Sequence, residues 1–235
     1  MSSEIIDWYK VIPTSFLNNS ENPNYDYHKL KTPFYGLISG NSGSGKSQML
    51  LSIIKAFSDK TKNKKKVGTF FDIWIFVKSA DEPIYRWIKT LSPNIHILED
   101  ISKLNIDKDF DVDLNHLLVF DNMLLVKNQN PMCDVYSRCR KKNISVLYLT
   151  QDFHKTPIFI RRNCRYLFIM KLSGNRETML VMREYGSGLS KKQLVGMYDY
   201  ATKGFGCPLL IDLEAPIETK YRRGLLEFLN PDDFL

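Results

Sequence analysis

Short apolar runs, rich in β-branched and aromatic residues, recur along the chain and predict β-strands. Amphipathic segments of helical length lie between many of them. Near-continuous apolar strands separated by helices indicate parallel strands covered on both faces. The predicted fold is therefore α/β, with a central, mostly parallel sheet flanked by helices. Strands are predicted at 34–40, 70–77, 94–98, 116–121, 144–150, 164–172 and 207–213, and helices at 46–58, 82–91, 130–140, 176–185 and 190–201.

The chain divides into a polar beginning and one long apolar-patterned remainder. Residues 1–32 are polar and turn-rich, and they predict an N-terminal arm laid over the surface. Residues 33–235 predict a single domain. A chain of 235 residues with 43% hydrophobic residues can bury a full core, and no internal repeat or long linker divides it.

The segment GNSGSGKS (40–47) matches the phosphate-binding pattern GxxxxGK[S/T] in full. It lies between a predicted strand and a predicted helix, as its mechanism requires. Glycines let the backbone N–H groups curl around a phosphate, and the following helix directs its positive N-terminal end at the same place. Lys46 is expected to reach the β- and γ-phosphates, and the Ser47 hydroxyl to bind Mg²⁺. The residues predicted to bind ATP are Gly40, Asn41, Ser42, Gly43, Ser44, Gly45, Lys46, Ser47 and Gln48.

Two other strand ends carry candidate catalytic side chains. Asp121 ends the run LLVFD and is the Walker B candidate, which would hold Mg²⁺ together with Ser47. Gln151 follows ISVLYLT, where its amide could contact both the γ-phosphate and the attacking water. The runs 70–77 and 94–98 fall between the two Walker motifs and leave room for a strand inserted between the two Walker strands. RecA-like motor ATPases have such an inserted strand, whereas small kinases usually place the Walker strands side by side. The GFG segment at 204–206 is interpreted as a turn.

The charge balance favours an anionic partner. The chain has 33 Lys and Arg against 26 Asp and Glu, a formal charge of +7. This excess suits nucleic acid or an anionic membrane and does not choose between them. The lysine run 60–66 is equally consistent with a solvated loop and with a DNA contact. Sequence-independent DNA contact is expected from further positive surface at Lys141, Lys142, Lys191, Lys192, Lys203, Arg222 and Arg223.

Several classes of protein are disfavoured. No apolar run approaches the about 20 residues of a membrane span, and the N-terminus lacks a secretory pattern. A soluble, intracellular protein without a membrane partner is expected. The four cysteines and four histidines are spaced singly, which indicates neither a zinc site nor a redox motif.

In combination, these motifs resemble the FtsK/HerA-type genome-packaging ATPases of poxviruses, giant viruses and virophages. Besides the two Walker motifs, the likeness rests on SRCRKKNISVLYLTQDFHKTPIFIRRNCRYLFIMKL, and it covers about residues 34–222. The resemblance implies a RecA-like ATPase domain of the additional-strand type, acting as an ATP-driven translocase that packages viral DNA. It further implies a ring of five or six copies with ATP between neighbours, double-stranded DNA through the middle and a capsid or portal partner. The implied location is the host cytoplasm, in a viral factory, or the virion.

In such rings an arginine from the next subunit stabilises the charge on the transferring phosphoryl group. Arg140 and then Arg138 are favoured, because they precede the strand that ends at Gln151. Arg161 and Arg162 are the other candidates.

One position departs from the family pattern. Asn122 stands where a second carboxylate usually follows the Walker B aspartate, and an amide can orient water but cannot accept its proton. The γ-phosphate itself could take the proton, hydrolysis could be slow, or another carboxylate could serve. The candidate carboxylates are Asp81, Glu82 and Asp152. Two alternative functions stay open: a nucleotide kinase or other small-molecule phosphotransferase, and a non-hydrolysing ATP-gated scaffold.

Overall fold

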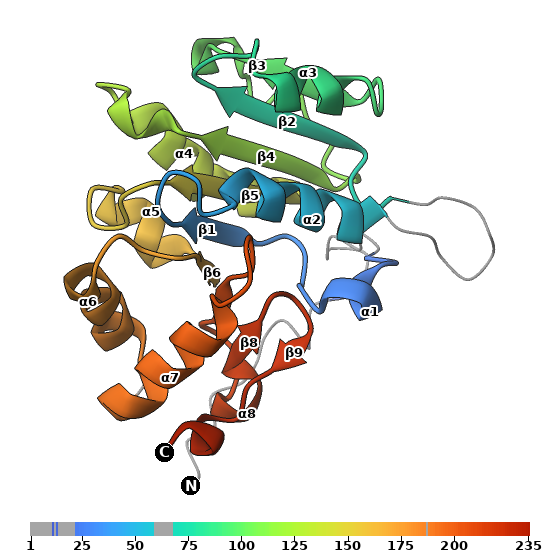
Figure 1. Ribbon diagram of the computed structural model, residues 1–235. Helices are drawn as coiled ribbons and strands as arrows, with labels where there is room; N and C mark the ends of the chain where they lie inside the picture. Colours follow the sequence, from blue (N-terminus) through green and yellow to red (C-terminus); the bar gives the residue numbers. More distant parts are fainter. Residues whose placement is uncertain (1–10, 12, 14–21, 59–67, 187) are drawn as a thin grey trace, which may run out of the picture.

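A single twisted sheet runs through the molecule, with helices on both faces (Figure 1). The structure is a computed structural model that describes residues 11, 13, 22–58, 68–186 and 188–235. Within these residues the strand order is β3-β2-β4-β5-β1-β6-β7-β8-β9. The strands are β1 (Tyr35–Ser39), β2 (Asp72–Val77), β3 (Ile95–Leu98), β4 (His116–Asp121), β5 (Ile144–Thr150), β6 (Tyr166–Ile169), β7 (Leu209–Asp212), β8 (Tyr221–Arg223) and β9 (Glu227–Phe228).

The strands from β3 to β6 in this order pair in parallel, whereas β7, β8 and β9 add to the sheet antiparallel. The predicted α/β fold with a mostly parallel sheet is confirmed. The antiparallel pairing of β8 and β9 follows from the short links before them, because a parallel crossover needs a dozen or more residues. The strands β8 and β9 were not expected from the sequence.

The expected helices are present, with small shifts at their ends. The helix after the phosphate loop has the predicted bounds. Four-residue helices α1 and α8, and the six-residue α5, were not expected. The helices are α1 (Tyr25–His28), α2 (Lys46–Ser58), α3 (Pro83–Lys89), α4 (Asn130–Arg138), α5 (Ile158–Asn163), α6 (Asn175–Tyr185), α7 (Lys191–Ala201) and α8 (Ile217–Lys220).

A strand does lie between the two Walker strands, β1 and β4, but it is β5. The sequence suggested that β2 or β3 would supply it, because they fall between the two motifs in the chain. Instead β2 and β3 lie outside β4, and the chain returns through α4 to place β5 inside. The strand that ends at Gln151 is therefore the one next to the phosphate-loop strand.

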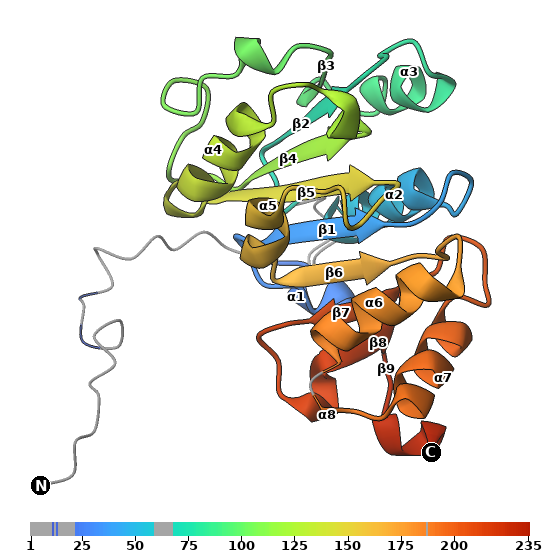
Figure 2. The same cartoon turned by 90° about the vertical axis from the view of Figure 1, so that its left-hand side faces the viewer.

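The two faces of the sheet bury separate apolar cores. The helices α2 and α3 pack on one face, with Leu50, Ile53 and Ile88 fully buried there. The other face is covered by α4, α5, α6 and α7. Figure 2 shows α4, α5 and α6 in front of the sheet and α2 and α3 behind it. Burial on both faces explains the near-continuous apolar strands in the sequence.

The described part of the predicted arm, residues 22–32, packs against the far end of α2. The ring of His28 stacks on Phe57 with 3.7 Å between ring centroids, and the Asn24 side-chain amide donates to the Phe57 carbonyl at 2.7 Å. His28, Asn24 and Leu30 are fully buried. The remainder of the arm apart from Val11 and Pro13, and the lysine run 60–66, lie outside the described residues. Within the described part of the chain, no helix has the length and apolar character of a membrane span.

The buried His28 makes stability depend on pH. Burial, with the nearby charges of Lys29 and Arg222, lowers the pKa of His28 from 6.5 to about 4. Below pH 6.5 the unfolded chain therefore binds a proton that the folded chain excludes, so stability falls with pH until about pH 4. We expect this one group to remove about 2 kcal/mol between pH 7 and pH 5.

Urea unfolding at pH 7 and pH 5 measures this loss. The control is His28→Phe, which keeps a ring against Phe57 and cannot titrate. Between pH 7 and pH 5, the free energy of unfolding of His28→Phe should fall by about 2 kcal/mol less than that of the unchanged protein. Equal losses in the two proteins would contradict the assignment to His28.

Candidate nucleotide-binding site

A cleft of about 420 Å³ opens where the parallel strands β1, β4 and β5 end. The arrowheads of these strands point to the right in Figure 2, toward the loop that precedes α2. The cleft brings together the phosphate loop, both predicted strand-end side chains and residues from α3. Its lining comprises Ser42, Gly43, Gly45, Lys46, Ser47, Gln48, Val77, Lys78, Glu82, Tyr85, Asp121, Asn122, Gln151 and Phe205.

The phosphate loop has the backbone shape that its glycines predict. Gly43 and Gly45 have φ of 76° and 93°, in the left-handed region that favours glycine. Among the described residues, the N–H groups of Gly43, Gly45, Lys46 and Ser47 have no hydrogen-bond acceptor. Those of Lys46 and Ser47 open the 13-residue helix α2, where the first N–H groups have no intrahelical partner. The loop thus presents unpaired donors and a positive helix end, which is what a bound phosphate requires.

Gly45 is required for a second reason. A Cβ atom placed on Gly45 would lie 2.6 Å from the Cα of Gly206. Gly206 belongs to the loop between α7 and β7, so this loop packs directly on the phosphate loop. The segment 204–206 was interpreted only as a turn. Gly206 does have the positive φ of a turn glycine, 71°, and it also forms one wall of the site.

Lys46 lies over the loop that it is predicted to serve. Its Nζ donates to the carbonyls of Gly40 and Asn41, at 2.8 and 2.7 Å. Burial lowers the pKa of Lys46, and the neighbouring charge of Asp121 opposes this shift. The ammonium group is therefore held between the loop and the Walker B carboxylate, where the terminal phosphates of a nucleotide would lie.

Asp121 is buried and has a partner that the sequence did not indicate. The phenol of Tyr85 donates a hydrogen bond to Oδ2 of Asp121, and it also lies within hydrogen-bonding reach of the Ser47 hydroxyl. Burial raises the pKa of Asp121, while the Tyr85 hydrogen bond and the charge of Lys46 act to lower it. Burial and the charge of Asp121 raise the pKa of Tyr85 far above its usual value, so Tyr85 remains a donor.

The two predicted magnesium ligands, Ser47 and Asp121, thus lie on either side of one phenol. A hydroxyl and a carboxylate are hard oxygen donors, which Mg²⁺ prefers. A triphosphate bound in the neighbouring phosphate loop, the phosphate cradle, would supply further oxygens. The residues present therefore fit a magnesium–triphosphate complex.

Gln151 and Asn122 line the same cleft. Asn122 has φ 57° and ψ 31°, a left-handed conformation that asparagine adopts more readily than most residues. Its backbone N–H donates to the Leu149 carbonyl at 3.3 Å, which ties the end of β4 to β5. Asparagine at this position therefore suits the left-handed backbone conformation found there.

Three residues of the cleft had little or no signal in the sequence. Tyr85 belongs to α3, which is distant in the chain from both Walker motifs and matches no motif. Phe205 is a large apolar side chain that is 79% exposed at the edge of the cleft. In the sequence, only the glycines on either side of Phe205 marked this segment as unusual. Glu82 was one of three candidate carboxylates, and it is the one that lines the cleft.

Of the four candidate arginines, the three with described side chains, Arg138, Arg161 and Arg162, do not line the cleft of their own chain. Arg138 is ion-paired with Asp107 and, at 3.3 Å, with Asp134. It ends α4, near the beginning of β5 and so at the opposite edge of the sheet from the cleft. Arg161 pairs with Glu184 at 3.2 Å and Arg162 is exposed. The side chain of Arg140 lies outside what the structure describes.

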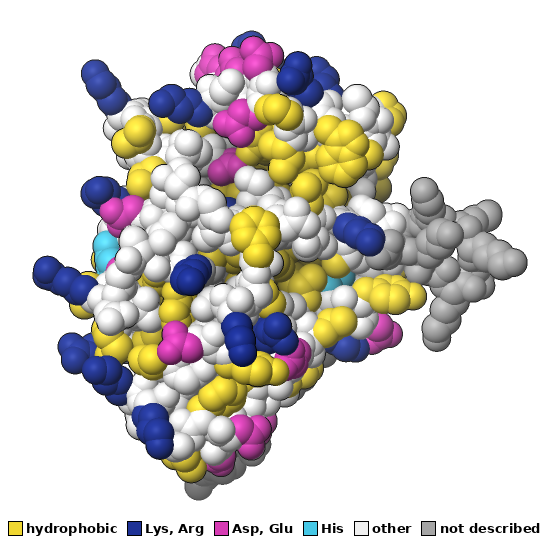
Figure 3. All heavy atoms as spheres, in the orientation of Figure 1, with side chains coloured by type: hydrophobic (Ala, Val, Ile, Leu, Met, Phe, Trp, Pro, Cys, Tyr) yellow, Lys and Arg dark blue, Asp and Glu magenta, His cyan; other side chains and the backbone are white. Residues whose placement is uncertain are grey.

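Part of the predicted positive surface is wrong. Arg222 is 4% exposed, and it donates to the Lys29 carbonyl at 3.2 Å and pairs with Asp212 at 3.5 Å. Arg223 is paired with Glu227 at 3.2 Å. Figure 3, which has the orientation of Figure 1, shows Lys and Arg side chains scattered over this face and along its margin rather than gathered in one patch.

Comparisons with known proteins find relatives among viral DNA packaging proteins. No protein-family model matches the chain. It is 30% identical over 172 residues to the DNA packaging protein OPG160 of Variola virus and of Vaccinia virus strain Copenhagen, which covers 64% of this chain. The chain spans only 58% of the length of those relatives.

Solved structures extend the likeness to the fold. B204, described as the DNA-packaging ATPase of Sulfolobus turreted icosahedral virus, superposes with a TM-score of 0.52 at 13% identity, over 78% of this chain and 94% of B204. EccC of Thermomonospora curvata gives a TM-score of 0.51 at 12% identity, over 84% of this chain and 38% of that one. These findings confirm the predicted resemblance and the RecA-like P-loop fold.

The contact between Gly45 and Gly206 leads to a test of the cradle. Gly45→Ala forces a side chain onto a left-handed backbone and against a neighbouring main chain. Such strain costs about 1 to 3 kcal/mol, so affinity for magnesium–ATP should fall by about 10- to 100-fold. Calorimetric titration measures this affinity.

Gly174→Ala is the matched control, because a Cβ atom there meets no neighbour within 4 Å and the backbone φ is −161°. Unchanged affinity in Gly45→Ala would show that the cradle is not formed as described.

Proposed function

We propose that this chain, a relative in sequence of the poxvirus DNA packaging proteins, binds ATP and Mg²⁺ in the cleft and couples ATP hydrolysis to the packaging of viral DNA. The observation that supports this most directly is the convergence of four elements. The phosphate cradle, Ser47, Asp121 and Gln151 all line one cleft of about 420 Å³. A cavity of this size lies within the range that encloses small-molecule ligands.

Each group has a defined task in this proposal. The cradle and Lys46 bind the β- and γ-phosphates and neutralise their charge, which is how P-loop proteins hold a triphosphate. Ser47 and Asp121 hold the magnesium ion, which supplies further charge stabilisation when bound. Gln151, exposed at the end of β5, orients the attacking water.

Phe205 supports a nucleotide rather than a simple phosphate as the ligand. Its ring is 79% exposed beside the phosphate cradle, with its loop held against Gly45. An exposed flat ring next to a triphosphate site is suited to stack on a nucleobase, because aromatic faces pair in offset stacks.

The wider proposal is a ring with DNA in its centre and ATP between subunits. The described side chains of Arg138, Arg161 and Arg162 do not line the cleft of their own chain, which supports an arginine from a neighbour as the residue that contacts the γ-phosphate. Such a residue contributes about 10³ to 10⁵ in rate in other P-loop enzymes. Five or six copies, double-stranded DNA and a capsid or portal protein are the proposed assembly. Arg140 is the preferred arginine.

The strand order favours a motor over a nucleotide kinase. Small kinases usually place the two Walker strands side by side, whereas here β5 separates β1 from β4. A non-hydrolysing scaffold is the second candidate, and Asn122 in the cleft is the observation that favours it.

An ATPase assay with and without double-stranded DNA tests the proposal. We expect DNA to stimulate hydrolysis, and the stimulation to weaken as salt rises. Each neutralised phosphate should add about −0.9 to the slope of log affinity against log salt. Lys46→Ala and Asp121→Asn should each reduce turnover by about 100-fold or more, because each removes charge stabilisation at the phosphates.

Lys55→Ala and Asp113→Asn are matched controls, since both residues are exposed and lie outside the cleft. Equal hydrolysis with and without DNA would argue against a packaging motor. Faster ADP formation with added AMP would indicate a kinase, and tight ATP binding without turnover would indicate the scaffold.

A further inference from the structure

We infer that Glu82 supplies the carboxylate that accepts the proton of the attacking water, in the place left without a carboxylate by Asn122. The inference rests on the proposed hydrolysis of ATP. It assigns the acid–base chemistry of the site to the residue just before α3, which lies outside both Walker motifs.

Glu82 reaches the cleft because of the strand next to the Walker B strand. The strand β2 pairs in parallel with β4, and its last residue, Val77, is in register with Asp121. The chain then turns through residues 78–82 and enters α3 at Pro83. Glu82 consequently lines the cleft together with Lys46, Asp121 and Gln151.

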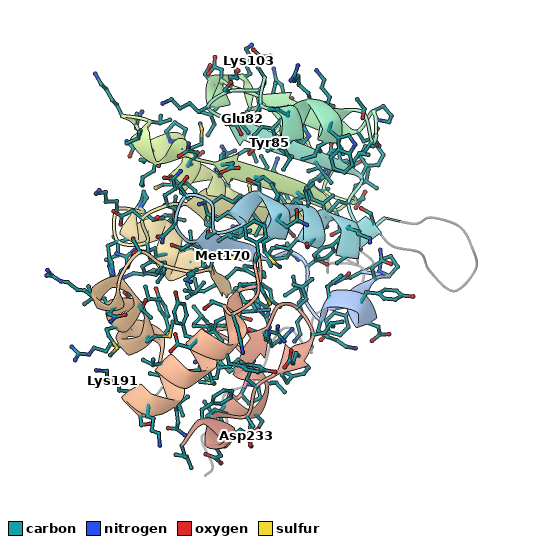
Figure 4. All side chains as sticks on the ribbon, viewed as in Figure 1. Glu82, Tyr85, Lys103, Met170, Lys191 and Asp233 are labelled. Atoms are coloured by element: carbon teal, nitrogen blue, oxygen red, sulfur yellow. The ribbon has the colours of Figure 1, made fainter. Side chains whose placement is uncertain are left out.

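Tyr85 fixes the beginning of α3 against the site. Glu82, the residue just before this helix, and Tyr85 in its first turn both line the cleft. Figure 4 shows the two side by side, between α3 and the amino-terminal end of α2. The Tyr85 phenol is hydrogen-bonded to Asp121, and the N–H groups of Tyr85 and Arg86 donate to the Glu82 carbonyl at 3.0 and 3.1 Å. The backbone that bears Glu82 is thereby attached to the Walker B carboxylate.

The carboxylate of Glu82 is available. Glu82 is the N-cap residue of α3, yet its side chain makes no capping hydrogen bond. It is exposed, and within the described part of the chain no hydrogen bond or ion pair engages it. It lines the same cleft as Asp121 and Tyr85.

The other candidate carboxylates either have another role or partner or lie outside the cleft. Among the described residues, Asp121 and Glu82 are the carboxylates that line it. Asp121 serves the magnesium ion. Asp81 is exposed and does not line the cleft. Asp152 accepts from the Lys155 N–H at 3.0 Å, pairs with its ammonium at 3.1 Å and lines a different hollow.

The proposed step balances without any further reactant. The water oxygen forms a bond to the γ-phosphorus as the bond from that phosphorus to the bridging oxygen breaks. ADP leaves with the electron pair of the broken bond. One water proton passes to the Glu82 carboxylate, which later returns it to solvent, and the other stays on the phosphate. Gln151, on another strand end, orients the same water.

The decisive variant is Glu82→Gln, which keeps the size and polarity of the side chain and removes the base. Proton transfer by a positioned side chain contributes about 10²- to 10⁴-fold, so kcat should fall by that range. Affinity for magnesium–ATP, measured by calorimetric titration without turnover, should stay within about two-fold. Glu82→Asp should retain part of the rate. The neighbouring Asp81→Asn is the control and should hydrolyse ATP normally.

The outcomes separate this inference from the proposed function. Normal hydrolysis by Glu82→Gln, with Lys46→Ala inactive, would overturn the role of Glu82 and leave the ATPase intact. Loss of magnesium–ATP affinity in Glu82→Gln would also overturn it, because Glu82 would then bind the metal or nucleotide. No hydrolysis by the unchanged protein, under any condition with DNA, would remove both proposals.

Discussion

The site depends on the hydrogen-bond ladder of three parallel strands, β1, β5 and β4. Parallel pairing puts the ends of these strands at one edge, with Ser39 opposite Thr150 and Leu149 opposite Asp121. The ladder continues past the strand ends, since the Gly40 N–H donates to the Thr150 carbonyl at 3.2 Å and the Asn122 N–H to the Leu149 carbonyl at 3.3 Å. The first residue of the phosphate loop and the first residue after Walker B are thus both bound to β5. A one-residue slip would turn the side chain of Asp121 to the other face of the sheet.

The antiparallel end of the sheet completes the cleft from the other side. The chain passes from α7 through Gly204, Phe205 and Gly206 into β7, and Gly206 packs on Gly45 so closely that a Cβ atom on Gly45 would lie 2.6 Å from the Gly206 Cα. The strand β7 is paired with β6, which is paired with β1. One wall of the phosphate cradle is therefore built by a segment about 160 residues farther along the chain, and is positioned through two strand pairings.

Local features of the sequence were sufficient to predict the local parts of this arrangement. The helix α2 has its predicted bounds because the phosphate motif marks its start and an apolar face continues to Phe57. The strands were visible because both faces of the sheet are buried. Strand order was not, because it is set by packing between distant segments, and the inserted strand is β5 and not β2 or β3. Tyr85 and the burial of Arg222 had no local signal either, since their partners Asp121 and Asp212 are brought to them only by the fold.

The substitution at Asn122 and the position of Glu82 have a common structural basis. At residue 122 the chain leaves β4 in a left-handed turn and starts a short 3₁₀ helix, a geometry that suits asparagine and costs other side chains free energy. A carboxylate on Glu82 is free of that constraint, since this residue, just before α3, has φ −58° and ψ 137°, an extended conformation that any residue can adopt. Its distance from the Walker B strand along the chain is compensated by the hydrogen bond between Tyr85 and Asp121. The carboxylate proposed to bind the metal, Asp121, and the one proposed to accept the proton, Glu82, then follow neighbouring strands, and the Tyr85 phenol links the backbone of the second to the first.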